Sequence, residues 1–190
     1  MGGWIAIAVV GLFLLLIVVL IGWAIGTYNK LVMGRNKVKN SWSQIDVQLK
    51  RRFDLIPNIV ETVKGYATHE KSIFEEFAKA RKLYDTGNSE GNVGKMAEAN
   101  SQLTKLVALT VEQYPNLKAD VQFIKLQETL SDTENKIAFA RQFYNDVVLS
   151  FNNLREVFPS NIIANMFGFK EAELFKLASE EEKEAPKVKF

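Results

Sequence analysis

Cysteine is absent from the 190 residues, and histidine occurs once, as His69. Disulfides, thiolate metal sites, a cysteine nucleophile and metal sites with several histidine ligands are therefore excluded. The sequence also lacks a Walker A loop, a GxGxxG fingerprint and an HExxH motif. We predict a protein that is not an enzyme, with no catalytic residues, no metal, no cofactor and no small-molecule substrate.

Charged residues are missing from the first 29 positions. Residues 4–25 form an unbroken run that is apolar except for Gly11 and Gly22. At 1.5 Å per residue this run is roughly 33 Å long, enough to cross the ~30 Å hydrocarbon layer of a bilayer. A signal peptide has a basic start and a shorter apolar core, and this sequence has neither. Residues 1–29 are therefore predicted to be a short N-terminus and an uncleaved transmembrane helix.

Basic residues are concentrated directly after this run, where residues 30–52 contain only one acid, Asp46. The basic cluster consists of Lys30, Arg35, Lys37, Lys39, Lys50, Arg51 and Arg52. The positive-inside rule predicts a single pass with the N-terminus outside and the rest of the chain in the cytoplasm. The cluster either sets this topology alone or also binds anionic headgroups at the membrane surface. Nucleic acid is not an expected partner, because the residues after the cluster are net acidic.

The remainder of the chain has the apolar spacing of helices. From Val38 to Ile56 the apolar residues recur every three or four positions. Pro57, Pro115 and Pro159 divide the long segments and are predicted to be helix kinks. Residues 86–94 are predicted to be a loop and residues 161–177 a further helix. The predicted fold is all-α: a transmembrane helix, a bundle of long antiparallel helices at 30–178, and a charged flexible tail at 179–190.

Two sets of residues each allow two interpretations. Acids and bases within apolar helix faces, among them Asp54, Arg81 and Glu134, form either a buried polar site or interhelical ion pairs that fix the helix register. Asn135, Asn145 and Asn152 fit the second interpretation, because buried polar groups discourage long helices from sliding. The densest apolar cluster outside the membrane run is either a cap on the bundle or a candidate interaction patch. It consists of Phe158, Ile162, Ile163, Met166, Phe167, Phe169, Leu174 and Phe175.

Several ordered motifs resemble the LemA family. They include the stretch NSWSQIDVQLKRR at 40–52, DLIPNIV at 54–60, YPNLKA at 114–119 and ARQFYN at 140–145. The resemblance implies a bacterial protein of the inner membrane, with one transmembrane helix and a helical cytoplasmic domain. Some members of the family are associated with magnetosome membranes. The resemblance implies no reaction.

The function predicted from these features is a membrane-anchored helical scaffold that self-associates and organises or remodels the membrane or recruits envelope partners. The alternative is a regulatory adaptor of a membrane enzyme, such as an envelope protease. The expected partners are the lipid bilayer, further copies of the chain in a homo-oligomer, and a membrane protein.

Overall fold

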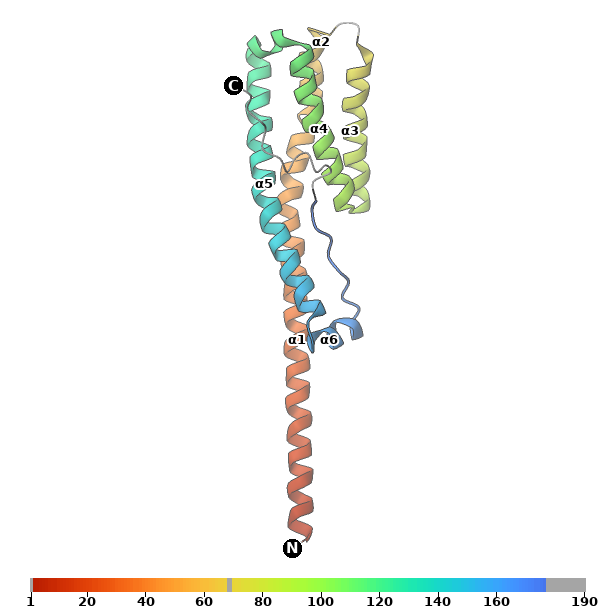
Figure 1. Ribbon diagram of the computed structural model, residues 1–190, viewed down its shortest axis with the longest axis vertical. Helices are drawn as coiled ribbons and strands as arrows, with labels where there is room; N and C mark the ends of the chain where they lie inside the picture. The colour runs from red at the N-terminus through yellow and green to blue at the C-terminus, as the bar shows by residue number, and fades with distance from the viewer. Residues whose placement is uncertain (1, 68–69, 177–190) are drawn as a thin grey trace, which may run out of the picture. The chain divides into compact units, whose positions relative to one another are not determined.

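A computed structural model describes residues 2–67 and 70–176 (Figure 1). The predicted tail at 179–190 and His69 lie outside these residues. The described part contains helices and no strand, which confirms the all-α prediction. The elements in chain order are α1 (Gly2–Phe53), α2 (Ile56–Lys64), α3 (Lys71–Glu90), α4 (Val93–Gln113), the 3-10 helix η1 (Pro115–Ala119), α5 (Val121–Glu156) and α6 (Ser160–Met166).

Helix α1 runs for 52 residues without interruption. No proline occurs within it, so each backbone amide after its first turn can donate a hydrogen bond. Among the described helices it is the one that is long and apolar enough to cross a membrane, and its apolar window is not buried at all. The apolar segment at 4–25 is therefore almost entirely uncovered by protein up to its last turn, as a membrane anchor requires.

The described residues divide into two compact units. The first unit contains residues 2–40 and 146–172, and the second unit contains residues 41–145 and 173–176. Each unit has its own buried residues, and they are described separately below.

In the second unit, α3 and α4 form an antiparallel hairpin with a very short connection (Figure 1). Gly91 ends α3 with φ 63°, a conformation that favours glycine, and the Asn92 side chain caps α4 by accepting from the Lys95 amide. The loop predicted at 86–94 is therefore reduced to Gly91 and Asn92. Gly87 lies within α3, and its missing Cβ lets Lys95 and Met96 of α4 approach closely.

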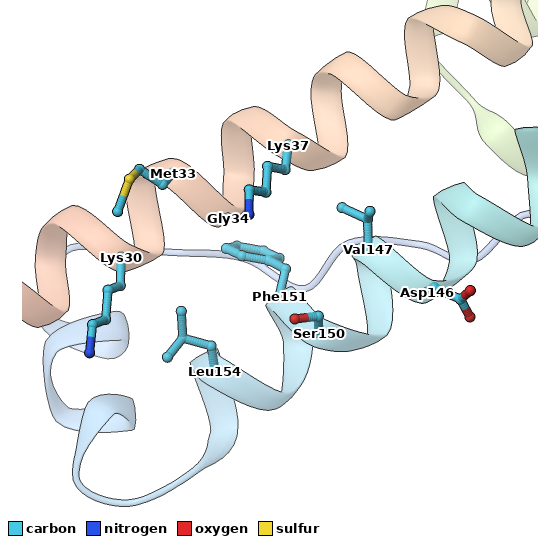
Figure 2. Close-up of a pocket in the computed structure, with 9 residues that line it drawn as sticks. All are labelled: Lys30, Met33, Gly34, Lys37, Asp146, Val147, Ser150, Phe151 and Leu154. Atoms are coloured by element: carbon cyan, nitrogen blue, oxygen red, sulfur yellow. The ribbon is translucent and has the colours of Figure 1, made fainter.

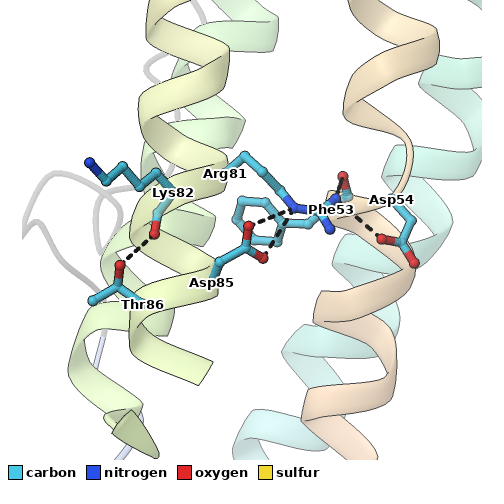
Figure 3. A network of polar contacts seen from close by, with 6 residues as sticks. All are labelled: Phe53, Asp54, Arg81, Lys82, Asp85 and Thr86. Atoms are coloured by element: carbon cyan, nitrogen blue, oxygen red, sulfur yellow. Dashed lines mark hydrogen bonds and ion pairs between the residues drawn. The ribbon is translucent and has the colours of Figure 1, made fainter. Parts of the chain in front are cut away.

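The core of the second unit includes the last turns of α1. Ile45, Leu49 and Phe53 are completely buried, as the apolar spacing of this stretch predicts. The Phe53 ring stacks on Tyr84 of α3, with ring centroids 4.3 Å apart and planes 6° from parallel. Arg81 of α3 donates to the Phe53 carbonyl oxygen at 2.8 Å, so a carbonyl left free at the end of α1 has a partner (Figure 3).

The three prolines lie where helices begin, and not at kinks within helices. Pro57 is in the first turn of α2, Pro115 opens η1, and Pro159 precedes α6. The first turn of a helix has no intrahelical acceptor for its amides, so a residue without an N–H is tolerated there. The prolines therefore separate elements.

The helix predicted at 161–177 ends at Met166 in the structure. Gly168 adopts φ 66°, which stops the helix, and residues 169–176 have no regular secondary structure. We call residues 169–176 the strap. Asn152 of α5 binds the strap in the first unit: its Nδ2 donates to the Ala172 carbonyl and its Oδ1 accepts from the Ala172 amide, both at 2.9 Å.

Asn145 of α5 makes the same pair of bonds in the second unit, to both backbone groups of Phe175. The neighbouring Tyr144 hydroxyl donates to the Glu173 carbonyl at 2.8 Å. Burial raises the pKa of Tyr144 to about 12, so the hydroxyl keeps its proton and remains a donor at neutral pH. The two asparagines therefore hold the strap through its backbone.

Candidate functional site

The first unit has a small core directly beyond the apolar segment of α1. The core cluster consists of Leu31, Phe151, Ile163, Ala164 and Phe169, from α1, α5, α6 and the strap. Ala24, the second-last residue of the apolar segment, packs against this cluster. A Cβ on Gly34 would lie 2.9 Å from Cδ2 of Phe151, so the glycine lets this ring lie directly on the α1 backbone.

An aromatic cluster links α1 to the end of α6. The Tyr28 ring lies 4.7 Å from Phe167 and 5.8 Å from Phe169, measured between centroids. The guanidinium of Arg35 stands over the other side of this cluster, 5.5 Å from the centre of the Phe169 ring, within the range of a cation–π contact. Because Tyr28 is three residues beyond Ile25, these contacts place Phe167 next to the end of the apolar segment.

A groove of about 460 Å³ lies between α1 and α5 in the first unit. Its floor is the contact between Gly34 and Phe151, and its walls carry both charged and apolar groups (Figure 2). The lining residues are Lys30, Met33, Gly34, Lys37, Asp146, Val147, Ser150, Phe151 and Leu154.

The two lysines of this groove can bind an anion. Lys30 and Lys37 lie seven residues apart on α1, which is about 10.5 Å along the helix axis. Both are exposed, and within the described part of the chain neither forms an ion pair. The Ser150 hydroxyl adds a neutral donor, while Met33 and Leu154 supply apolar surface. Asp146 is the one acid in the lining, so the groove is suited to a group that combines negative charge with an apolar part.

The predicted basic cluster divides between the two units. Lys30, Arg35, Lys37 and Lys39 are exposed in the first unit, and Lys50 and Arg51 are exposed in the second. The prediction is wrong for Arg52, because this residue is only 3% exposed and so does not contribute to a membrane surface.

Arg52 is the centre of a buried polar network in the second unit. Its guanidinium donates to Asn100 Oδ1 at 2.9 Å and to the Thr104 hydroxyl at 3.0 Å, and it pairs with Glu134 of α5. Burial lowers the pKa of Arg52 to about 10, which still leaves it charged at neutral pH. This network joins α1, α4 and α5, as the ion-pair interpretation of the scattered charges predicts.

A second network joins α1 to α3 (Figure 3). Arg81 contacts Asp54 and Asp85, each at 3.2 Å, in addition to the Phe53 carbonyl. These groups are substantially exposed, and their arrangement fixes the end of α1 without enclosing a cavity.

The candidate interaction patch is partly a core. Ile163 and Phe169 are buried in the first unit, and Phe175 is buried in the second unit beside Trp42, at 6.0 Å between ring centroids. The remaining members of the patch are exposed: Phe158, Ile162, Met166, Phe167 and Leu174. Side chains on the inner side of α6 point to the core, so only part of the predicted patch is available for contact.

Hydrolase chemistry receives no support from the described residues. The letters GNSEG at 87–91 fit the GxSxG pattern of hydrolase nucleophiles, which requires a sharp turn between a strand and a helix. Ser89 instead lies in the last turn of α3, where its hydroxyl donates to the Thr86 carbonyl. Within residues 2–67 and 70–176, no three histidine or carboxylate side chains gather as metal ligands would.

Comparison with known families gives a match over most of the chain. The sequence model of the LemA family covers residues 41–190. This chain belongs to the LemA family. The match includes the whole described part of the second unit, and the apolar segment lies before it. The groove is divided, because its α1 residues precede the match and its α5 residues lie within it.

Curated relatives are similar over most of the chain. Protein LemA of Metamycoplasma hominis is 25% identical over 162 residues, which cover 84% of this chain and 73% of the relative. Magnetosome protein MamQ 2 of Paramagnetospirillum magneticum is 26% identical over 176 residues. That alignment covers 78% of this chain and 64% of the relative, so the chain spans less than two thirds of that magnetosome protein. Together with the uncovered apolar segment of α1, these similarities indicate a membrane-anchored protein.

Proposed function

We propose that this LemA-family chain is a non-enzymatic scaffold that holds a helical domain at a membrane, self-associates, and organises or remodels the membrane or recruits envelope partners. The observation that carries the proposal is the apolar segment of α1, which is long enough to cross a membrane and whose apolar window of 18 residues is not buried by the described chain. Such a segment ties the helical part of the chain to a bilayer. The relation to magnetosome proteins, which are named for a membrane compartment, supports the same proposal.

Self-association has a candidate surface on α5 in the second unit. Phe139 and Phe143 are 81% and 53% exposed and lie four residues apart, so they share one face of the helix. Two neighbouring exposed phenylalanines are uncommon unless another surface covers them. Anchoring in a bilayer raises the effective concentration of the copies, so a contact of this size is sufficient for association. We expect a closed, symmetric homo-oligomer with its transmembrane helices side by side.

Mass photometry of the full chain in mild detergent tests this proposal. We expect one homogeneous oligomer that shifts toward monomer when Phe139 and Phe143 are both replaced by serine. Leu109→Ser is the matched control, because Leu109 is also exposed in the second unit but lies on α4. A monomer at every concentration in more than one detergent would overturn the scaffold and favour the adaptor of a membrane enzyme.

The proposed location is the bacterial inner membrane, with the N-terminus outside and the helical domain in the cytoplasm. Four exposed basic residues, Lys30, Arg35, Lys37 and Lys39, follow the apolar segment closely and support this orientation. A phosphatase that is active only in the periplasm, fused after Phe190, is expected to be inactive. An active fusion would reverse the orientation.

A further inference from the structure

Helix α6 and the residues that flank it have one buried face and one apolar face that is largely exposed in the described chain. Its buried face consists of Ser160, Ile163 and Ala164, which pack into the first unit. On the other side the exposed fractions are 75% for Phe158, 49% for Ile162, 70% for Met166 and 57% for Phe167. We call these four residues the α6 apolar face.

The α6 apolar face lies at the level where α1 leaves the apolar segment. Phe167 contacts Tyr28, three residues beyond that segment, with the ring centroids 4.7 Å apart. The core that contains Ile163 of α6 also takes up Ala24, which is inside the segment. Figure 1 shows α6 beside α1, next to the long stretch of α1 that no other element covers.

The sequence around α6 is free of charge. No Lys, Arg, Asp or Glu occurs between Val157 and Phe169, whereas Glu156 precedes this stretch and Lys170 follows it. Transfer of this stretch to the border between headgroups and hydrocarbon therefore carries no penalty for burying an ion. Helices with one exposed apolar side commonly lie in this border region with that side toward the lipid.

We propose that the α6 apolar face inserts into the interface of the bilayer that α1 spans, in the leaflet next to the helical domain. The occupant is lipid because the face continues the surface of a helix that is itself embedded in lipid. The expected depth is ~5–10 Å below the headgroups, as for other interfacial helices. The first unit then has two attachments to the same membrane, one spanning segment and one wedge in a single leaflet.

This inference rests on the membrane anchoring in the proposed function and not on self-association.

The absence of cysteine allows one dye to be placed at one chosen position. The full chain with Met166→Cys, labelled with an environment-sensitive thiol dye, is reconstituted into vesicles of phosphatidylcholine and phosphatidylglycerol. Lipids brominated near the headgroup or near the end of the acyl chain then report contact with lipid and its depth.

Two control positions carry the same dye. Leu14→Cys lies in the middle of the apolar segment, and Leu109→Cys replaces an exposed leucine of α4 in the second unit, outside the proposed self-association surface. We expect the dye at Met166 to be quenched more strongly by the shallow bromines and the dye at Leu14 by the deep ones. Quenching at Leu109 is expected to be several-fold weaker than at either site. Adding Phe158→Ser and Ile162→Ser to the Met166→Cys chain is expected to reduce its quenching several-fold.

Each other result overturns the inference in a distinguishable way. If Leu14 is quenched and Met166 is not, the wedge is absent although the anchor is present. If neither is quenched, the membrane anchoring in the proposed function fails as well. If the dye at Met166 is shielded from water only at high protein density, and without quenching by bromine, the face is covered by a second copy or another protein.

Discussion

Two arginines of the second unit and two lysines of the first unit use charge in opposite ways. In the second unit Arg52 is buried with Glu134, and Arg81 connects Asp54 and Asp85, so these two cations hold helices together. In the first unit the groove lysines, Lys30 and Lys37, face solvent without ion pairs in the described chain. The two arginines are therefore satisfied within the protein, whereas the two lysines follow closely after an apolar segment, where the phosphates of a bilayer are suitable partners.

The largest expected effect comes from opening the polar network of the second unit. Arg52→Ala removes the buried guanidinium and leaves Asn100, Thr104 and Glu134 without their shared partner. Breaking a buried ion pair from one side costs about 3–5 kcal/mol, and the partial exposure of Glu134 places the expected loss near ~3 kcal/mol. Thermal unfolding of the full chain in detergent, followed by circular dichroism, measures this loss.

Arg51→Ala is the matched control for Arg52→Ala. Arg51 is exposed on the same turn of α1, so its replacement is expected to change stability by less than about 0.5 kcal/mol. Equal effects of the two substitutions would show that the network does not support the second unit.

The next effect concerns the groove in the first unit. Replacing Lys30 and Lys37 by glutamine is expected to weaken retention of anionic phospholipid by ~1 kcal/mol per lysine, roughly five-fold for each. Phosphatidylglycerol that remains bound after detergent extraction can be counted by native mass spectrometry.

Replacing Lys50 and Arg51 by glutamine is the matched control. It distinguishes lipid binding in the groove from attraction of lipid by the positive charge of the whole chain. Both are exposed cations of the second unit, and their removal is expected to leave lipid retention unchanged. A similar loss from both pairs would mean that net charge alone attracts the lipid and that the groove has no role.

A smaller effect is expected from the close contact on which the groove is built. Gly34→Ala forces the Phe151 ring away from α1, since the new Cβ would lie 2.9 Å from Cδ2 of the ring. Overpacking costs about 1–3 kcal/mol, and the better helix propensity of alanine offsets about 1 kcal/mol of this cost, so a net loss of at most about 2 kcal/mol is expected. Gly26→Ala, where nothing lies within 4 Å of the new Cβ, should be neutral or stabilising in the same melting experiment.

The smallest effect concerns the start of α5 in the second unit. Asp120 accepts from the Gln122 and Phe123 amides, so Asp120→Ala should slightly lower the melting temperature at neutral pH. The Phe123 amide, followed by the Tyr66 hydroxyl, lowers the pKa of this carboxyl below its usual 3.8. Its stabilising contribution is therefore complete above the usual pKa and is lost as the pH falls through the lowered value.

Melting curves of the native chain and Asp120→Ala, recorded at neutral and strongly acidic pH, test this linkage. The difference in melting temperature between the two chains should shrink in acid. A difference that persists after the carboxyl is protonated would assign the effect to another cause.

The approximate positions of the helices were predictable, because the spacing of apolar residues and the positions of proline and glycine can be read directly from the sequence. The stripe from Val38 to Ile56 and the long α5 are examples. Helix ends were less predictable, because they depend on the backbone conformation of single residues. Gly91 and Gly168 have positive φ and end their helices, whereas Gly87 lies within α3. The sequence at 86–94 does not show which of its glycines ends the helix.

The candidate site was predictable only in part. Sequence position placed Lys30 and Lys37 near the membrane, but it could not separate them from Arg52, which becomes buried through contacts with residues about fifty and eighty positions away. The prediction of an exposed patch around α6 was wrong for Ile163 and Phe169 for a similar reason. These two side chains are buried by residues of α1 and α5 that are distant in the sequence. Gly34 carried a usable signal, since an isolated glycine in a helical pattern often marks a close approach.

The two asparagines that hold the strap also restrict how the length of this chain can change. Asn152 binds both backbone groups of Ala172 in the first unit, and Asn145 binds both backbone groups of Phe175 in the second unit. A residue that is bound through both backbone groups is fixed in register against its asparagine. A single insertion or deletion between Phe169 and Ala172 would therefore either present another residue to Asn152 or pull Phe169 out of its core. Changes of length are expected to be tolerated at the α3–α4 turn and rejected in the strap.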